Sequence, residues 1–307
     1  MIWAPLKFAS TEDELTFPAD RFDYSAIIDR PPLTLPGDAR IVVWTIINVE
    51  EWDIRGPMPR NALPAPGGGS LVPDIPNWSW HEYGMRVGFW RLKRALDHHG
   101  IKATMAINGS VCLSYPRIAL AAKDAGWEFM GHGYTQKALH VEDDQRETIR
   151  KSIEVIRDFS GKAPRGWLGA GLAETWDTVD LLAEEGIEYV SDWVTDEQPH
   201  WMKTQSNPLV MVPYTLEIND VPLMLIHHYP APELFARAKD QFDRLYEEGK
   251  QSARVMAIAV HPYVTGVPHR IKYFEQIYDY MKLHPGVLFW KGDEILDWYK
   301  GLEAPPI

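Results

Sequence analysis

The sequence predicts an α/β fold, specifically a closed or nearly closed (β/α) barrel of parallel strands. Short apolar runs rich in β-branched residues alternate with segments of helical periodicity, and glycine follows several of the predicted helices. This alternation is typical of parallel strands joined by right-handed crossovers. Roughly six or more such units in one chain favour a closed or nearly closed barrel over an open sheet.

The first half of the chain contains the clearest strand. Residues 41–47 form a continuous apolar run, which is typical of a strand buried on both faces. A helix is predicted over 82–99, where apolar residues recur every three or four positions and Gly100 follows. The other elements expected here are a strand at 101–107, a helix at 116–125, a strand at 127–130 and a helix at 143–159.

The second half continues the pattern. A helix at 174–185 lies between strands at 165–169 and 187–191. After a long loop, the apolar runs 209–213 and 222–227 are predicted as strands. The chain is expected to finish with a helix at 232–248, a strand at 254–260, a helix at 269–283, a strand at 286–290 and a short helix at 292–300.

We expect residues 1–307 to form a single domain, because α/β barrels of this length are routinely one domain. Two segments stand outside the alternation: an N-terminal extension over 1–37 and a Pro/Gly-rich loop over 55–80. The loop contains the run 67–70, three glycines and a serine, which precedes no helix directly and is therefore not predicted to bind phosphate. We expect the loop to fold over the barrel mouth or to reach a neighbouring subunit.

Charge and composition exclude several classes of function. The chain has 31 Lys and Arg against 43 Asp and Glu, a formal charge of −12, which argues against nucleic acid or an anionic membrane as partner. No segment approaches the ~18 apolar residues of a membrane helix, and the start does not resemble a signal peptide. The one cysteine, Cys112, can form neither an internal disulfide nor a thiolate metal site. We therefore expect a cytoplasmic protein that acts on a small molecule.

Polar residues occur at the ends of the predicted strands, where barrel enzymes place their active sites. Glu50 and Glu51 follow the first strand, and His132 and His261 follow the strands at 127–130 and 254–260. With Arg165 at the fourth strand, these groups form a plausible acid–base site for hydrolysis, and we expect all five to be catalytic. The residues expected to line the substrate pocket are Asn48, Trp52, Gln136, Trp167, Asp192, Trp193 and Trp201.

Each of these residues also has a purely structural interpretation. The two glutamates fit ordinary loop carboxylates, the histidines fit satisfied structural groups, and Arg165 fits a simple ion pair. The chain has 13 tryptophans, which we divide between core or interface positions and the smaller set at the mouth. The second set suggests a ring-shaped, largely uncharged substrate.

The order of these segments resembles the polysaccharide deacetylase superfamily, whose domain is a distorted, often seven-stranded β/α barrel of the glycoside hydrolase/deacetylase type. The matching segments are 45–51, 132–136, 165–169 and His261, which stand where that family has Thr-Phe-Asp-Asp, His-Ser/Thr-x-x-His, Arg-x-x-x-Gly and a late histidine. The stretches 82–92 and 212–220 resemble the branch that contains metal-independent allantoinase, cyclic imide hydrolases and certain peptidoglycan deacetylases. The resemblance implies a hydrolase of carbon–nitrogen bonds other than peptide bonds.

The metal motif departs from that family, whose zinc, cobalt or nickel ion is bound by an aspartate and two histidines. Glu50 and Glu51, or Asn48 and Glu50 in a shifted register, replace the family's aspartate pair, and Gln136 stands at the second histidine. A neutral amide is a poor ligand for these ions, so we expect no metal cofactor. If zinc, nickel or cobalt were bound, the candidate ligands would be Glu51 and His132 with Gln136 or His140.

Three functions fit these residues. The first is hydrolysis of a small cyclic amide, a ureide or an imide, in which Glu50 or Glu51 takes a proton from water and His261 protonates the leaving nitrogen. In that scheme His132 orients the water or the carboxylate, and Arg165 and backbone amides stabilise the oxyanion. The alternatives are a metal-dependent N-deacetylase of acetylated sugars or peptidoglycan fragments, and a catalytically degenerate binding module. The resemblance also implies a homo-oligomer, a dimer or a tetramer.

Overall fold

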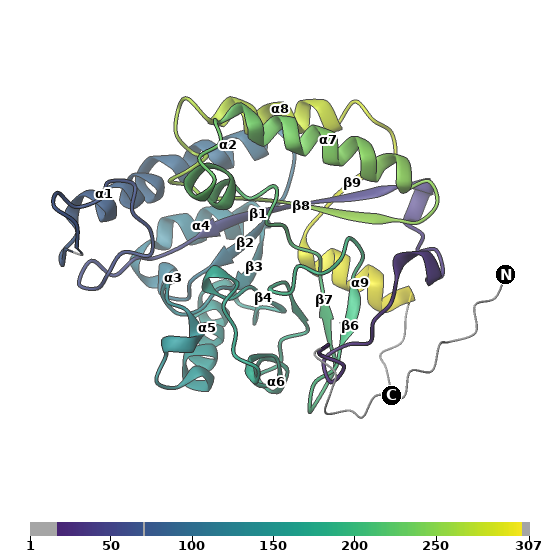
Figure 1. The fold of residues 1–307 in the computed structure, drawn as a ribbon, viewed down its shortest axis with the longest axis horizontal. Coiled ribbons are helices and arrows are strands. Elements are labelled where there is room, and N and C mark those ends of the chain that lie inside the picture. Colours follow the sequence, from purple (N-terminus) through teal and green to yellow (C-terminus); the bar gives the residue numbers. More distant parts are fainter. Residues whose placement is uncertain (1–16, 70, 303–307) are drawn as a thin grey trace.

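The computed structural model describes residues 17–69 and 71–302, and one curled, mostly parallel sheet runs through them with helices packed around it (Figure 1). The strand order is β6-β7-β5-β4-β3-β2-β1-β8, and β9 also pairs with β1. Only β6 runs antiparallel to its neighbour, β7, among the pairings of the described residues. The predicted distorted (β/α) barrel is confirmed, in an incompletely closed form. Residues 1–16 of the predicted extension, and Ser70 of the predicted loop, lie outside the described residues.

The strands are built around β1, which pairs with β8 along one edge and with β9 and then β2 along the other. Between β7 and β8 there is no ladder in the described residues, and one parallel bridge, Asn219 with Ala259, joins the two sides. The strands are β1 Ile41–Val49, β2 Thr104–Ile107, β3 Glu128–Gly131, β4 Gly166–Trp167, β5 Tyr189–Val190, β6 His200–Met202, β7 Leu209–Met211, β8 Arg254–Val260 and β9 Val287–Trp290.

Most of the helices cover the outer face of the sheet, and α2, α7 and α8 lie together along β1 and β8 (Figure 1). Helix α9 instead packs its buried residues against the inner layer. No helix in the described part of the chain is long and apolar enough to cross a membrane. The helices are α1 Ile75–Tyr83, α2 Phe89–His99, α3 Val111–Ser114, α4 Pro116–Asp124, α5 Gln145–Ser160, α6 Thr178–Glu184, α7 Pro232–Glu248, α8 Ile271–Met281 and α9 Gly292–Leu302.

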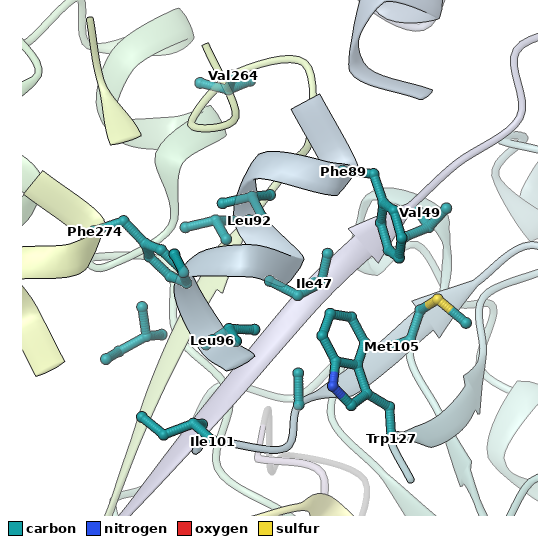
Figure 2. Close-up of a cluster of buried hydrophobic side chains, with 14 of the residues drawn as sticks. Ile47, Val49, Phe89, Leu92, Leu96, Ile101, Met105, Trp127, Val264 and Phe274 are labelled. Atoms are coloured by element: carbon teal, nitrogen blue, oxygen red, sulfur yellow. The ribbon is translucent and has the colours of Figure 1, made fainter. Parts of the chain in front are cut away.

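Strand β1 separates two hydrophobic layers because successive side chains of a strand point to opposite faces. Its odd-numbered residues, including Ile47 and Val49, pack outward against Phe89 and Leu92 of α2 (Figure 2). Its even-numbered apolar residues pack inside the barrel, with Trp44 fully buried there. The inner row continues past the apolar residues to polar ones, so β1 delivers the site residues Asn48 and Glu50 to the barrel interior.

Three sequence predictions need correction. The run 222–227, predicted as a strand, forms the π-helical turn Val221–Ile226. An unbroken apolar run does not distinguish a strand from a buried helical segment, and here Pro222 lies in the first turn and Asn219 accepts a hydrogen bond from the Val221 amide at 3.1 Å. The edge strand β6 was not predicted. The last part of the predicted 55–80 loop belongs to α1, whose first turn is capped by Asp74.

Helix α1 continues through a π-helical turn, Gly84–Gly88, into α2, so the predicted helix over 82–99 begins earlier and is irregular. The two glycines of this turn let it approach the segment that follows β8. A Cβ atom on Gly84 would lie 2.5 Å from the Tyr263 amide nitrogen, and a Cβ atom on Gly88 would overlap the Pro262 carbonyl. The helix therefore presses directly on the residues next to His261.

We predict that Gly88→Ala destabilises the protein by about 2 kcal/mol, because the added methyl group overpacks a rigid backbone contact. Gly301→Ala is the matched control, since a Cβ atom there meets nothing within 4 Å. Urea unfolding monitored by circular dichroism measures both variants. Equal midpoints for the two would contradict the claim that the turn is packed as described.

Candidate active site

A buried carboxylate, that of Glu50, lies at the centre of the candidate site, and its side chain is 4% exposed. Trp52 donates from Nε1 to Oε2 at 2.8 Å, and the Tyr263 hydroxyl donates to the same oxygen at 3.1 Å. The Gln136 side-chain amide donates to Oε1 at 3.0 Å. These donors come from three separate segments, so one carboxylate holds the barrel mouth together.

His261 forms an ion pair on each side of its ring. Its Nδ1 lies 2.6 Å from Asp220 Oδ1, and its Nε2 lies 3.4 Å from Glu50 Oε1. The other oxygen of Asp220 accepts from the His261 backbone amide at 2.8 Å and from the Thr265 hydroxyl at 2.6 Å. The imidazole is thus fixed between two buried carboxylates.

The charges of this group set its protonation. Burial alone would lower the pKa of His261, but the charge and hydrogen bond of Asp220, and then those of Glu50, raise it to about 9. Burial likewise would raise the pKa of Glu50, but the hydrogen bond and charge of His261, with smaller contributions from His132 and Trp52, lower it to about 2. At neutral pH the arrangement is therefore carboxylate, imidazolium, carboxylate.

His132 is the second imidazole of the site and has the opposite character. Its Nδ1 lies 2.5 Å from the Leu168 carbonyl oxygen, so this nitrogen carries the proton and donates it. Its Nε2 has no hydrogen-bond partner among the described residues. Burial lowers the pKa of His132, and the nearby charge of Glu50 offsets this only in part. His132 is therefore a neutral imidazole with a free lone pair.

Two functional positions were not selected from the sequence. Asp220 lies directly before the run predicted as a strand, where no strand end was expected. Asn108 follows β2 and accepts from the Glu51 amide at 2.8 Å while its own amide donates to the His132 carbonyl oxygen at 2.5 Å. The strand-end rule applied to β2 would have found Asn108, whereas Asp220 ends the stretch 212–220 noted for its resemblance, where no role was assigned to it.

Glu51 and Asn48 lie beside this cluster in different ways. Glu51 is half-buried, and its Oε2 is buried without a hydrogen-bond partner among the described residues. Its backbone carbonyl accepts from the Gln136 amide at 3.0 Å. Asn48 is buried inside the barrel, where its amide lies 3.4 Å from the Tyr214 hydroxyl oxygen and 3.5 Å from the Val260 carbonyl oxygen. Both residues therefore hold the strand ends in place.

Arg165 does not join the site. It precedes β4 and therefore lies at the N-terminal edge of the sheet, opposite the mouth. There it pairs with Glu188 at 2.6 Å and with Asp297 of α9 at 2.8 Å. The expected position at the mouth, and with it the oxyanion role, is wrong; the ion-pair interpretation describes this residue.

The predicted pocket residues divide into two groups. Trp52 and Gln136 contact Glu50 directly, whereas Asp192 and Trp193 follow β5 and interact with Glu174 instead. Two expectations are wrong. Trp167 is fully buried in the outer core beside α5 and α6, and Trp201 packs on Tyr299 of α9, the helix that pairs with Arg165 at the N-terminal edge.

An aromatic cover encloses the site. The His81 ring stacks on Trp52 with the centroids 4.5 Å apart, and Trp80 contacts the Tyr263 ring at 4.9 Å. The residues His132 and His261 are only 3% and 6% exposed. A cavity of about 560 Å³ lies elsewhere, between residues 17–33 and 195–203, and contains none of these groups. The site is consequently covered by aromatic rings and almost shielded from solvent.

The metal ion that the deacetylase resemblance implies does not fit this donor set. In the described residues, no three His, Cys, Asp or Glu side chains are grouped so as to hold an ion. The Gln136 amide donates a hydrogen bond to the Glu50 oxygen that would face such an ion. His140, the alternative ligand, is exposed. We therefore derive no catalytic step through a metal.

Comparison with known proteins identifies relatives of this chain among the deacetylases. The family described as polysaccharide deacetylase matches residues 81–190. A protein of Schizosaccharomyces pombe assigned as a polysaccharide deacetylase is 30% identical over 230 residues, which cover 68% of this chain and 71% of the relative. The peptidoglycan deacetylase of Helicobacter pylori is 26% identical over 246 residues, 69% of this chain and 83% of the relative.

Two solved structures are similar over nearly the whole chain. The crystal structure of PuuE allantoinase has a TM-score of 0.81 at 26% identity, covering 91% of this chain and 96% of its own. A protein of Pseudomonas aeruginosa PAO1 assigned as a polysaccharide deacetylase has the same TM-score of 0.81 and 26% identity, covering 91% and 97%. The chain belongs to the polysaccharide deacetylase family, whose members are hydrolases of amide carbon–nitrogen bonds.

Proposed function

We propose that this protein hydrolyses a small cyclic amide, a ureide or an imide, without a metal ion. The observation that carries the proposal is the contrast between two of the buried imidazoles around Glu50, those of His261 and His132. His261 is held protonated by Asp220, whereas His132 is neutral with a free Nε2. When the surroundings of two titratable groups shift their pKa values in opposite directions, one group is suited to act as an acid and the other as a base.

The proposed reaction uses these two groups in sequence. His132 Nε2 accepts a proton from a water molecule as the water oxygen attacks the amide carbon, and His261 Nε2 then donates its proton to the nitrogen as the C–N bond breaks. The products are a carboxylic acid and an N–H group, and proton exchange with solvent resets both imidazoles. Glu50 is a poor base here, because its pKa is about 2 and donors already occupy its oxygens.

The covering of the site and the chemistry of the reaction support a small cyclic substrate. The rings of Trp52, Trp80 and Tyr263 pack on one another over the site, and a polymer chain requires an open groove. A strained or electron-poor ring carbonyl also needs less electrophilic assistance than an acyclic amide. The structural likeness to an allantoinase is compatible with this substrate class.

The alternative function is N-deacetylation of acetylated sugars or peptidoglycan fragments. The similarity to the Helicobacter pylori peptidoglycan deacetylase favours it, and so do the tryptophans around the site, because sugar rings stack on tryptophan. A catalytically degenerate binding module is the third candidate. The complete Asp220–His261–Glu50 arrangement argues against that candidate, because a binding scaffold does not need it.

We further infer a single-domain, cytoplasmic homo-oligomer, a dimer or a tetramer. The formal charge of −12 supports a soluble setting without nucleic acid or an anionic membrane as partner. Tyr24 and Ile28 of the N-terminal extension are 80% and 87% exposed, which supports burial of this segment against another subunit. Light scattering coupled to size-exclusion chromatography measures the subunit number.

The substrate class can be tested with chelator-treated protein. We predict hydrolysis of at least one of hydantoin, allantoin and succinimide, with the rate unchanged after chelation, because no step uses a metal. N-acetylglucosamine oligomers are the comparison substrates. Turnover of the oligomers alone, and only after zinc or nickel is added, would instead establish the deacetylase function.

Because the residues present do not fit the metal ion of the family, replacing Gln136 by the family's histidine should create a metal-binding site. Gln136→His removes the amide that donates to Glu50 and supplies a third ligand beside Glu50 and His132. We expect the variant, but not the unaltered protein, to bind Co²⁺ stoichiometrically, as followed by the visible absorption of the bound ion. His140→Gln is the matched control and should leave metal binding unchanged, since His140 is exposed. Stoichiometric Co²⁺ binding by the unaltered protein would contradict our description of the site.

The pKa contrast predicts a bell-shaped dependence of kcat/KM on pH. Activity should fall below the pKa of His132, which lies under its ordinary value of about 6.5, and should fall again above about 9, where His261 loses its proton. Asp220→Asn removes the charge that raises the pKa of His261, so the alkaline limb should move to lower pH while the acidic limb stays. An alkaline limb that does not move in this variant would remove His261 from the role of acid.

A further inference from the structure

A single peptide group connects His132 to a second buried cluster. The carbonyl of Leu168 accepts from His132 Nδ1 at 2.5 Å, and the adjoining amide of Gly169 donates to Asp192 Oδ1 at 2.7 Å. These two atoms belong to the same planar, resonance-stabilised unit, so a charge at one end polarises the bond at the other. The protonation state of Asp192 therefore affects the strength of the hydrogen bond that the His132 ring donates to this peptide.

Asp192 forms a carboxyl pair with Glu174. Its Oδ2 and the Oε1 of Glu174 are both buried without a donor when both groups are ionised, and the two side chains lie within hydrogen-bonding reach of each other. A single proton between them satisfies both oxygens. The second oxygen of Glu174 accepts from Trp193 Nε1 at 2.7 Å, which stabilises an ionised glutamate.

The charged surroundings favour the proton on Asp192. Burial and the facing Glu174 raise the pKa of Asp192 well above its usual range. Burial also raises the pKa of Glu174, but the hydrogen bond from Asp192, the bond from Trp193 and the charge of Arg21 counteract this. Tyr214 also faces the pair. Burial raises the pKa of its hydroxyl, so Tyr214 remains neutral. The pair thus carries one negative charge, centred on Glu174.

Gly169 shows that this contact is built into the backbone. A Cβ atom at this position would lie 3.0 Å from Asp192 Oδ1 and 3.1 Å from the Ala173 carbonyl oxygen. A larger residue would push the peptide away from Asp192, so the glycine permits the 2.7 Å bond. The link from Glu174 to His132 therefore consists of short, enclosed hydrogen bonds.

We propose that protonated Asp192 and ionised Glu174 form a positioning pair that acts through the Leu168–Gly169 peptide to hold His132 as the Nδ1–H tautomer with Nε2 free. Neither carboxyl group touches the reacting atoms, so both are positioning residues. The use of His132 as a base rests on the proposed function, whereas the link itself is a property of the substrate-free protein. The negative charge makes the Leu168 carbonyl a stronger acceptor and His132 a stronger base.

Three variants separate charge from hydrogen bonding. Asp192→Asn keeps the acceptor for Gly169 and a donor for Glu174, so it reproduces the protonated aspartic acid and is the matched control. The double variant Asp192→Asn with Glu174→Gln keeps nearly the same shape and removes the charge. Because glutamine offers one acceptor where Glu174 offers two, Trp193→Phe is measured beside it to give the effect of losing the Trp193 bond alone. Asp192→Ala removes the partner of the Gly169 amide. Thermal unfolding identifies any variant that does not fold, and the isosteric pair keeps the proposal testable if Asp192→Ala is such a variant.

Nitrogen-15 NMR of His132 in the substrate-free protein is the first measurement. We expect Asp192→Asn to retain the Nδ1–H tautomer and the pKa of the unaltered protein, and the double variant to show a lower pKa for His132. The kcat of the double variant should fall about tenfold or more, with the acidic limb of its pH profile at lower pH, while Asp192→Asn stays within about threefold. Asp192→Ala should show mixed tautomers.

The outcomes distinguish this proposal from the proposed function. If no cyclic amide is hydrolysed, the proposed function fails, and the NMR comparison still decides whether the link exists. The link is overturned if the pKa and tautomer of His132 are the same in all variants. It is also overturned if Asp192→Asn is as impaired as the double variant, because Asp192 would then have to be ionised.

Discussion

The buried ion pair between Glu50 and His261 is the interaction on which the rest of the site depends. A carboxylate taken out of water is tolerated only when donors surround it, and Glu50 obtains them from the segment after β1, the loop after β3 and the segment after β8. Removing one partner from such a buried group typically costs about 3–5 kcal/mol. The strand ends therefore cannot separate independently. This explains how the described sheet, in which one bridge from Asn219 to Ala259 of β8 spans the gap after β7, still holds the site residues together.

The same interaction explains why this chain departs from the metal-binding pattern of its family. An imidazolium held by Asp220 supplies a fixed positive charge beside Glu50, and the Gln136 amide supplies a neutral donor to the same carboxylate. Together they satisfy the charge and the lone pairs that would otherwise attract a cation. A metal would have to displace both the amide and the imidazolium. Of the other imidazoles beside Glu50 in the described part of the chain, His81 already uses its Nε2 on the Glu50 carbonyl oxygen at 3.0 Å, which leaves His132. Changing the residue at 136 therefore alters the electrostatics of the whole site, and not merely one ligand.

Much of the fold could be predicted because its central strands are long and apolar. The runs that form β1 and β8 are buried along their whole length, and the strand-end rule correctly brought Glu50, His132 and His261 to one place. The failures have physical causes. Asp220 lies before an apolar run, and only the tertiary packing makes this run a helical turn instead of a strand. Arg165 lies at the start of its strand, and its ion pairs with Glu188 and Asp297 cannot be predicted from the hydrophobic pattern because both partners are distant in sequence.

The final contrast is between two imidazoles that the sequence presents alike, each directly after an apolar strand. Their difference lies in what accepts the hydrogen bond from Nδ1: a carboxylate for His261 and a peptide carbonyl for His132. The carboxylate stabilises the cation directly, so one ring stays protonated, whereas the carbonyl fixes a tautomer without supplying a full charge. A carboxyl pair lies one peptide group beyond that carbonyl. In our proposal its charge raises the basicity of His132 more than a neutral partner would and less than a carboxylate in direct contact with the ring would. The protein thus holds two imidazoles in different protonation states, and their distances to the nearest negative charge account for the difference.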